Sequence, residues 1–247
     1  MKILLIAGHG AGDPGACGCG YKEADLTREV VNQLLPKLKK YAEVDLFDTE
    51  KNMYAYLKSG HSFDFSKYDY VFEVHFNAGV KDTAGNGRTT GTEILVHTSE
   101  SGTTVEEAIL KKVCAFGFAS RGVKKRSDLL VMNTCKKKYA VSHALIETCF
   151  IDDSDDMKLY QSKKSEVIEA IADGIIAGFG LAKSEEDKSM AKFKDTNGHF
   201  AEKQIDELFE MGIVNGKGNG MFAPDDPITR AEVAIIARNV IRYITGK

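Results

Sequence analysis

Two histidines occupy positions in this sequence where a metal ion could be held. His9 follows an apolar run at residues 2–7, and His75 lies near the end of a second run, 68–76, which is rich in aromatic and β-branched residues. Ligands of open α/β sheets bind outside the carboxyl ends of the strands, so two such strands would bring both rings to one edge. Either histidine alone is better explained as a hydrogen-bonded core residue. Together, beside glycines at positions 8, 10, 12 and 15, they favour a metal site.

Three carboxylates are candidates to complete such a site. Catalytic zinc commonly has three protein ligands, with two histidines and one glutamate as a recurring set, and keeps one position open for water. Glu23 begins a predicted helix after the glycine-rich loop, although an acid stabilised by the helix dipole is a common alternative. Glu73, two residues before His75, is a rival ligand or a partner of that histidine. Glu147 lies in an apolar run, where a charge costs free energy unless it is paired or functional.

The rest of the first 181 residues provides the elements that would position these side chains. Apolar periodicity predicts strands at 2–7, 44–47, 68–76, 93–97 and 143–151, an extended piece at 129–132, and helices at 22–41, 50–58, 104–118 and 163–179. Pro36 is expected to kink the first helix or to end it near Leu35. Strands that alternate with helices predict an α/β fold, in which helices flank a mostly parallel twisted sheet. His97 would then end a strand at the same sheet edge, with a surface role favoured, and His143 is a candidate core residue.

A charged segment at 182–192 separates this domain, 1–181, from a small all-α module at 193–247. The module has two helical patterns, 199–211 and 229–243. Thr229 and Glu232 form a capping-box pattern at the start of the second one. Because so short a module buries little core alone, packing against another copy or another domain is expected.

Composition and charge exclude several classes of function. The net charge is −3 over 247 residues, so nothing indicates binding to nucleic acid or to an anionic membrane. No run approaches the ~20 apolar residues that membrane insertion needs, and the first run is shorter than the ~7–15 residues of a signal-peptide core. We therefore expect a protein made in the cytoplasm without a signal peptide. The five scattered cysteines fit reduced thiols, and Cys17 and Cys19 are better explained by a small flexible loop than by half a metal site or a strained disulfide.

Four segments occur in an order that resembles a known family. They are Gly8-His9-Gly10 within 7–16, Glu23, His75-Phe76-Asn77-Ala78, and Ile146-Glu147-Thr148-Cys149-Phe150. As a set they resemble the zinc-dependent N-acetylmuramoyl-L-alanine amidases of phage endolysins and sporulation lysins, over about residues 1–181. The sequence departs from the family at Cys149, where glycine is frequent, and at Glu73, a position that is often uncharged.

The resemblance implies both a site and a reaction. His9, Glu23 and His75 would be the Zn²⁺ ligands, and Glu147 the catalytic acid/base. Zinc-activated water would cleave the amide bond between N-acetylmuramic acid and the L-alanine of the stem peptide in peptidoglycan. Two alternatives stay open: a non-catalytic wall-binding or structural protein, and a zinc peptidase acting on wall peptides. The lack of a signal peptide favours a phage or prophage endolysin, which reaches the bacterial cell wall after release.

Residues 193–243 resemble a single S-layer homology unit. The resemblance is carried by Phe193-Lys194-Asp195, Met211-Gly212-Ile213-Val214-Asn215-Gly216 and Ile228-Thr229-Arg230-Ala231-Glu232. Such units bind secondary polymers of the cell wall. Arg230 is a candidate ligand because guanidinium offers a fixed fork of donors to anionic groups, although a local role in the loop–helix junction is the alternative. Because these units commonly occur in threes, one copy implies either weak binding or a homo-oligomer formed through the module.

Overall fold

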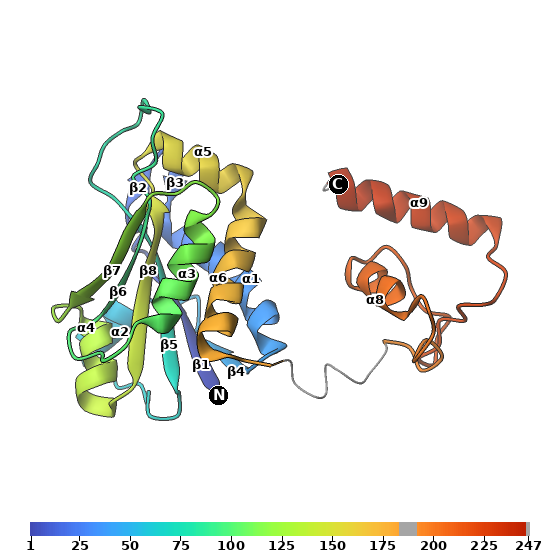
Figure 1. The fold of residues 1–247 in the computed structure, drawn as a ribbon, viewed down its shortest axis with the longest axis horizontal. Helices are drawn as coiled ribbons and strands as arrows, with labels where there is room; N and C mark the ends of the chain where they lie inside the picture. The colour runs from blue at the N-terminus through green and yellow to red at the C-terminus, as the bar shows by residue number, and fades with distance from the viewer. Residues whose placement is uncertain (183–191, 246–247) are drawn as a thin grey trace. The chain divides into compact units, whose positions relative to one another are not determined.

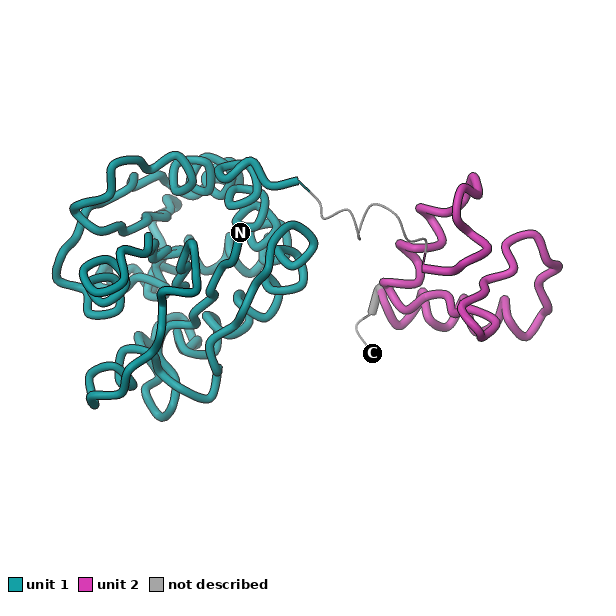
Figure 2. The backbone as a smooth tube through the Cα atoms, turned by 90° about the horizontal axis from the view of Figure 1, so that it is seen from below, with its two compact units in different colours: residues 1–183 teal, residues 184–247 magenta. Residues whose placement is uncertain are grey.

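The computed structural model describes residues 1–182 and 192–245. The chain divides into two compact units, Met1–Lys183 and Ser184–Lys247 (Figure 2). Most of the predicted linker, 183–191, lies outside the described residues.

The first unit is built on a six-stranded sheet with the order β4-β1-β5-β8-β6-β7 (Figure 1). Its strands are β1 (Lys2–Ala7), β4 (Glu43–Leu46), β5 (Tyr70–Asn77), β6 (Thr92–His97), β7 (Ser120–Arg126) and β8 (Ser142–Phe150). β4, β1, β5 and β8 run parallel, whereas β6 pairs antiparallel with β8 and parallel with β7. The predicted α/β fold with a mostly parallel sheet is therefore confirmed. A short hairpin, β2 (Cys17–Gly18) and β3 (Tyr21–Lys22), precedes the first helix.

Helices cover both faces of this sheet. They are α1 (Glu23–Lys39), α2 (Met53–Lys58), α3 (Thr104–Cys114), α4 (Leu130–Asn133), the π-helical turn η1 (Thr134–Lys138), α5 (Ser154–Ser162) and α6 (Lys164–Phe179). Figure 1 shows α3 and α6 on one side of the sheet and α2 and α4 on the other. Ile3 and Leu5 pack into the larger core under α1, α3 and α6, while Leu4 and Ile6 pack into a smaller core with residues of α2 and α4. After Lys2, β1 is apolar because both of its faces are buried.

Two local predictions need correction. Of the two effects predicted for Pro36, the end of the helix near Leu35 is wrong, because α1 passes through Pro36 to Lys39. Leu34 and Leu38 are fully buried, and this packing stabilises the last turn although proline removes one backbone hydrogen bond. Leu130–Asn133 is helix α4 rather than an extended piece, since a helical turn buries Val131 and Met132.

The second unit contains helices α8 (Glu202–Glu210) and α9 (Arg230–Thr245). Its buried core consists of a few apolar side chains: Phe193, Ile205, Ile213 and Val214. The backbone N–H of Thr229 donates to Glu232 Oε2 at 2.7 Å, and the N–H of Glu232 donates to Thr229 Oγ1 at 3.2 Å. The predicted capping box at the start of α9 is thus confirmed.

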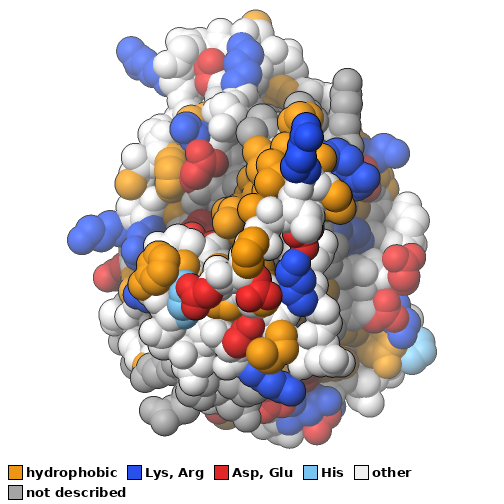
Figure 3. Space-filling model, turned by 90° about the vertical axis from the view of Figure 1, so that its right-hand side faces the viewer, with side chains coloured by type: hydrophobic (Ala, Val, Ile, Leu, Met, Phe, Trp, Pro, Cys, Tyr) orange, Lys and Arg blue, Asp and Glu red, His pale blue; other side chains and the backbone are white. Residues whose placement is uncertain are grey.

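Much apolar surface remains uncovered in this unit. Figure 3 shows a group of hydrophobic side chains on the surface turned to the viewer. The apolar residues exposed in the second unit include Phe200, Ile228, Ile235, Ile241 and Tyr243. Single exposed apolar residues are ordinary in folded proteins, so it is their number in so small a unit that is unusual.

None of the helices in the described ranges is long and apolar enough to span a membrane.

Candidate metal centre

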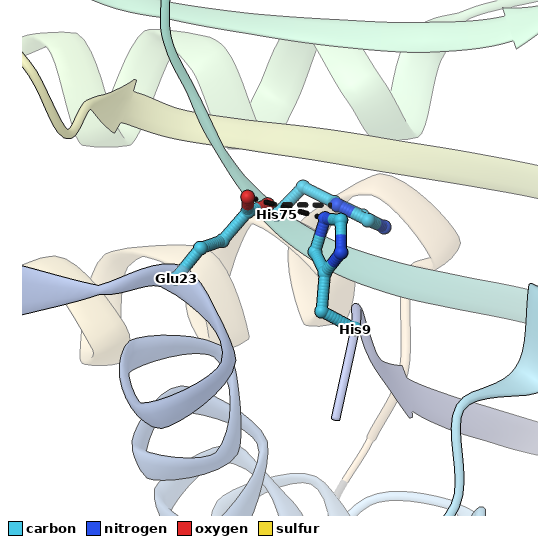
Figure 4. A group of neighbouring side chains, drawn as sticks. All are labelled: His9, Glu23 and His75. Atoms are coloured by element: carbon cyan, nitrogen blue, oxygen red, sulfur yellow. Dashed lines mark hydrogen bonds and ion pairs between the residues drawn. The ribbon is translucent and has the colours of Figure 1, made fainter. Parts of the chain in front are cut away.

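Three predicted ligands meet at one edge of the sheet (Figure 4). His9 follows β1, His75 lies near the end of β5, and Glu23 is the first residue of α1. One ligand atom from each lies within 4.8 Å of the others. Zinc bonds of ~2.0–2.2 Å in a tetrahedron place two ligand atoms roughly 3.5 Å apart, so small side-chain shifts would close the group around one ion.

Carboxylates face both nitrogens of each histidine ring in this group. Glu23 Oε1 lies 2.9 Å from His75 Nδ1, and Glu23 Oε2 lies 3.1 Å from His9 Nε2. The outer nitrogens face other carboxylates, with Asp13 Oδ2 at 2.8 Å from His9 Nδ1 and Glu73 Oε1 at 3.2 Å from His75 Nε2. All four ring nitrogens thus face a carboxylate, which as an ion only accepts hydrogen bonds, so the contacts place a donor on either side of each ring. A bound ion would take the place of the protons on His9 Nε2 and His75 Nδ1, the two nitrogens that face Glu23, while the nitrogens that face Asp13 and Glu73 would keep theirs.

The electrostatics of the group also suit a cation. Burial opposes the ionisation of Glu23, but hydrogen bonds from His75 and His9 outweigh it and hold its pKa well below the usual range. The hydrogen bond to Glu23 raises the pKa of His9. Burial lowers the pKa of His75, yet its hydrogen bonds to Glu23 and Glu73 raise it well above the ordinary value. A buried anion that holds two imidazoles in this way can hold a metal ion in place of their inner protons.

Glycines next to the group leave the space that these side chains fill. A Cβ atom at Gly8 would lie 2.4 Å from the His75 ring, and one at Gly15 would lie 2.7 Å from the His9 ring. Gly15 also has a φ of 65°, which other residues rarely adopt. His9 itself has a φ of 61°, a left-handed conformation that is strained for a residue with a side chain.

Glu147 lies on β8 beside the group. It is opposite His75 in the parallel pairing of β5 with β8. Its Oε2 is buried and has no hydrogen-bond partner among the described residues. Burial raises the pKa of Glu147 to about 7. A carboxyl group with a pKa near neutrality can both take up and release a proton at working pH, as acid–base catalysis needs.

The direction of β6 determines which other residues reach this edge. Because β6 runs antiparallel to β8, Glu93 at its start lies opposite Glu147. Glu93 forms ion pairs with Arg121 at 2.6 Å and Lys124 at 2.5 Å. It is not among the carboxylates that the sequence indicated. His97, at the other end of β6, lies at the opposite edge and is buried, so its predicted place and surface role are wrong. The sequence contains one weak indication of Glu93. This acid starts a predicted strand, and basic residues follow about 30 positions later.

A pocket of about 300 Å³ opens beside the candidate ligands. His9, His75 and Glu73 form part of its wall. Its other lining residues are Ala7, Asp13, Asn52, Met53, Tyr54, Asp128, Leu129, Leu130, Val131 and Leu145. Apolar walls with a few polar groups next to a metal site suit the binding of a substrate group.

Arg230, the candidate polymer ligand, belongs to the second unit. It is the first residue of α9 and its side chain is exposed.

The chain is similar to known amidases both in sequence and in fold. Residues 3–177 match the family model described as N-acetylmuramoyl-L-alanine amidase, and residues 192–234 match the S-layer homology domain. The chain is 30% identical over 191 residues to an endolysin of Bacillus phage SPP1, which covers 73% of this chain and 67% of that protein. It is 29% identical over 172 residues to a protein named Probable autolysin PH from Staphylococcus aureus, covering 63% of this chain but only 34% of that relative.

Two solved structures share the fold. The catalytic domain of CwlV, an N-acetylmuramoyl-L-alanine amidase from Bacillus (Paenibacillus) polymyxa var. colistinus, has a TM-score of 0.57 and 21% identity, covering 74% of this chain and 100% of that one. The CwlD amidase from Clostridioides difficile, solved with the GerS lipoprotein, has a TM-score of 0.57 and 19% identity, covering 72% and 98%.

Proposed function

Because the chain belongs to the N-acetylmuramoyl-L-alanine amidase family, we propose that it hydrolyses the bond between N-acetylmuramic acid and L-alanine in peptidoglycan, with Zn²⁺ as cofactor. The observation that carries the proposal is that His9, Glu23 and His75 each bring one ligand atom within 4.8 Å of the others, with one nitrogen of each ring facing the Glu23 carboxylate. This donor set is one that catalytic zinc sites use. The similarity to a phage endolysin supports a wall-lytic role of the endolysin type.

Each site residue has a distinct part in this reaction. His9 Nε2, His75 Nδ1 and the Glu23 carboxylate would hold the ion. The chemistry that a zinc ion would supply there is Lewis-acid polarisation of the scissile carbonyl and activation of water. Glu147 accepts the proton of the attacking water and delivers it to the amine of the departing L-alanine. Its pKa of about 7 suits both transfers.

We propose that two parts of the chain have different functions. Residues 1–181 form the catalytic domain, 182–192 a linker, and 193–247 a single S-layer homology-like module. The module binds a secondary cell-wall polymer, with Arg230 contacting its anionic groups. The exposed apolar side chains of α9 support a homo-oligomer formed through this module, which would gather several weak binding sites.

Digestion of purified peptidoglycan by the zinc-loaded protein, analysed by mass spectrometry, tests the proposal. An amidase releases intact stem peptides that begin with a free L-alanine amine and leaves glycan strands without peptide. Shortened stem peptides would instead identify a zinc peptidase. No released product, from a protein that still binds the wall, would identify a non-catalytic wall-binding protein.

A further inference from the structure

A buried carboxylate links the candidate metal centre to the interior of the sheet. Glu73 on β5 is 5% exposed and His143 on β8 is 1% exposed. Glu73 Oε1 lies 3.2 Å from His75 Nε2, and Glu73 Oε2 lies 2.9 Å from His143 Nε2. One carboxylate therefore accepts hydrogen bonds from two histidine rings on neighbouring strands.

The position of Glu73 separates it from the ligands. Glu23 faces Nδ1 of His75, whereas Glu73 faces Nε2 on the other side of the same ring. Glu73 also lies outside the group of three ligand atoms that are within 4.8 Å of one another. Its geometry fits a residue that acts through His75 rather than one that binds the ion.

His143 determines how Glu73 is held. Its Nε2 faces the Glu73 carboxylate, while its Nδ1 is buried without a hydrogen-bond partner among the described residues. A proton on that buried Nδ1 would have no acceptor, which is costly. A neutral His143 therefore keeps its proton on Nε2 and always donates to Glu73, which leaves the second carboxylate oxygen for His75.

We propose that Glu73, anchored by His143, is a positioning residue that keeps the His75 proton on Nε2 and thereby keeps Nδ1 available to the metal. The inference rests on the proposed zinc site. The corresponding contact of the other histidine differs, because Asp13 beside His9 has a side chain that is 50% exposed and open to water. Water reaches the Glu73 contact far less, because only 6% of the Glu73 side chain is exposed.

Glu73→Gln is the informative change because an amide has only one acceptor oxygen. His143 and His75 would compete to donate to that oxygen, and the amide NH₂ would face whichever ring does not donate to it. Since His143 cannot move its proton at low cost, the amide donates to His75 Nε2. This shifts the His75 proton to Nδ1, where it competes with the ion.

Zinc affinity, measured by competition with a chromophoric chelator, is the main readout. Glu73→Gln is expected to weaken binding by about 10–100-fold, the usual effect of removing such a partner. Adding His143→Phe releases the amide oxygen to His75, so the double variant should regain a substantial part of the affinity. Glu106→Gln is the matched control, because this buried glutamate of α3 accepts a hydrogen bond from Tyr70 at the start of β5, and the variant should bind zinc as the wild type does.

Several results would overturn the inference. Unchanged affinity of Glu73→Gln, or a double variant that binds no better than the single one, excludes the positioning role. If the variants do not fold, histidine ¹⁵N spectra of the zinc-loaded wild type decide the question: a proton on His75 Nε2 supports the inference and one on Nδ1 overturns it. If the wild type does not bind zinc tightly, the proposed function is overturned as well. If the wild type binds zinc and cleaves the wall, and the Glu73→Gln variant binds zinc equally well, only this inference is overturned.

Discussion

Replacing Glu147 with glutamine is expected to abolish wall hydrolysis and, above neutral pH, to stabilise the metal-free protein. Glutamine cannot take up the proton of the attacking water. It is also neutral at every pH, so it removes the cost of burying a charge beside Glu23, Glu93 and Glu73.

The size of this stability difference follows from the pKa of Glu147. Burial raises the pKa of Glu147 from 4.5 to about 7, so the folded state binds this proton more tightly than the unfolded state does. The contribution of Glu147 to stability is therefore lost as pH rises from 4.5 through 7. Between pH 5 and pH 8 the advantage of Glu147→Gln over the wild type should grow by about 2–3 kcal/mol.

Urea denaturation of the chelator-treated proteins, followed by circular dichroism because the chain has no tryptophan, measures this difference. Glu166→Gln changes an exposed glutamate that pairs with Lys163 at the surface, so its effect should be small and vary little with pH. An advantage of Glu147→Gln that stays constant from pH 5 to pH 8, or a variant less stable than the wild type at pH 8, would refute the reasoning. Residual wall hydrolysis at the wild-type rate would separately refute the catalytic role.

Four further changes test other parts of the molecule. Glu23→Gln should lose most bound zinc on dialysis, measured by elemental analysis, and a variant that keeps one equivalent would contradict the ligand assignment. Gly15→Ala places a Cβ 2.7 Å from the His9 ring at a φ of 65°. It should therefore lower the free energy of unfolding by about 1–3 kcal/mol and weaken zinc binding. An unchanged melting temperature would argue against this close packing. Arg230→Ala should reduce sedimentation with walls that retain their secondary polymer while leaving hydrolysis of soluble muropeptides unchanged, and equal binding would remove Arg230 from the ligand contact. Ile235→Asp should lower the mass of any oligomer in analytical ultracentrifugation, and a monomeric wild type would refute assembly through α9.

Parts of this site could be predicted from the sequence because they depend on local pattern. His9 and His75 follow apolar runs, and parallel strands carry their carboxyl ends to one edge. Glu147 was conspicuous as a charge among apolar residues. Glu23 needed the family resemblance, because the path of the loop between β1 and α1 depends on glycine conformations that residue order does not specify.

Other parts depend on long-range pairing, which local pattern does not contain. The direction of β6 follows from its antiparallel contact with β8, so Glu93 was missed and His97 was placed at the wrong edge. Strand β7, Ser120–Arg126, is polar enough to resemble a solvated loop. The continuation of α1 through Pro36 reflects the burial of Leu34 and Leu38, which outweighs the local preference of proline.

The backbone around His9 gives metal uptake a second role. Residues 9 to 12 all have positive φ, and two of them, His9 and Ala11, are not glycine, which costs about 1–2 kcal/mol each. Of the proposed site residues, only His9 lies in such a loop, while the others lie on a strand or a helix. The ordered loop and the bound ion are thus linked equilibria, and the measured affinity equals the intrinsic one scaled by the fraction of molecules whose loop is ordered. A zinc ion bound as proposed would hold the amino-terminal loop in place, and in the metal-free chain this segment should be the first to exchange its amide hydrogens and to be cut by proteases.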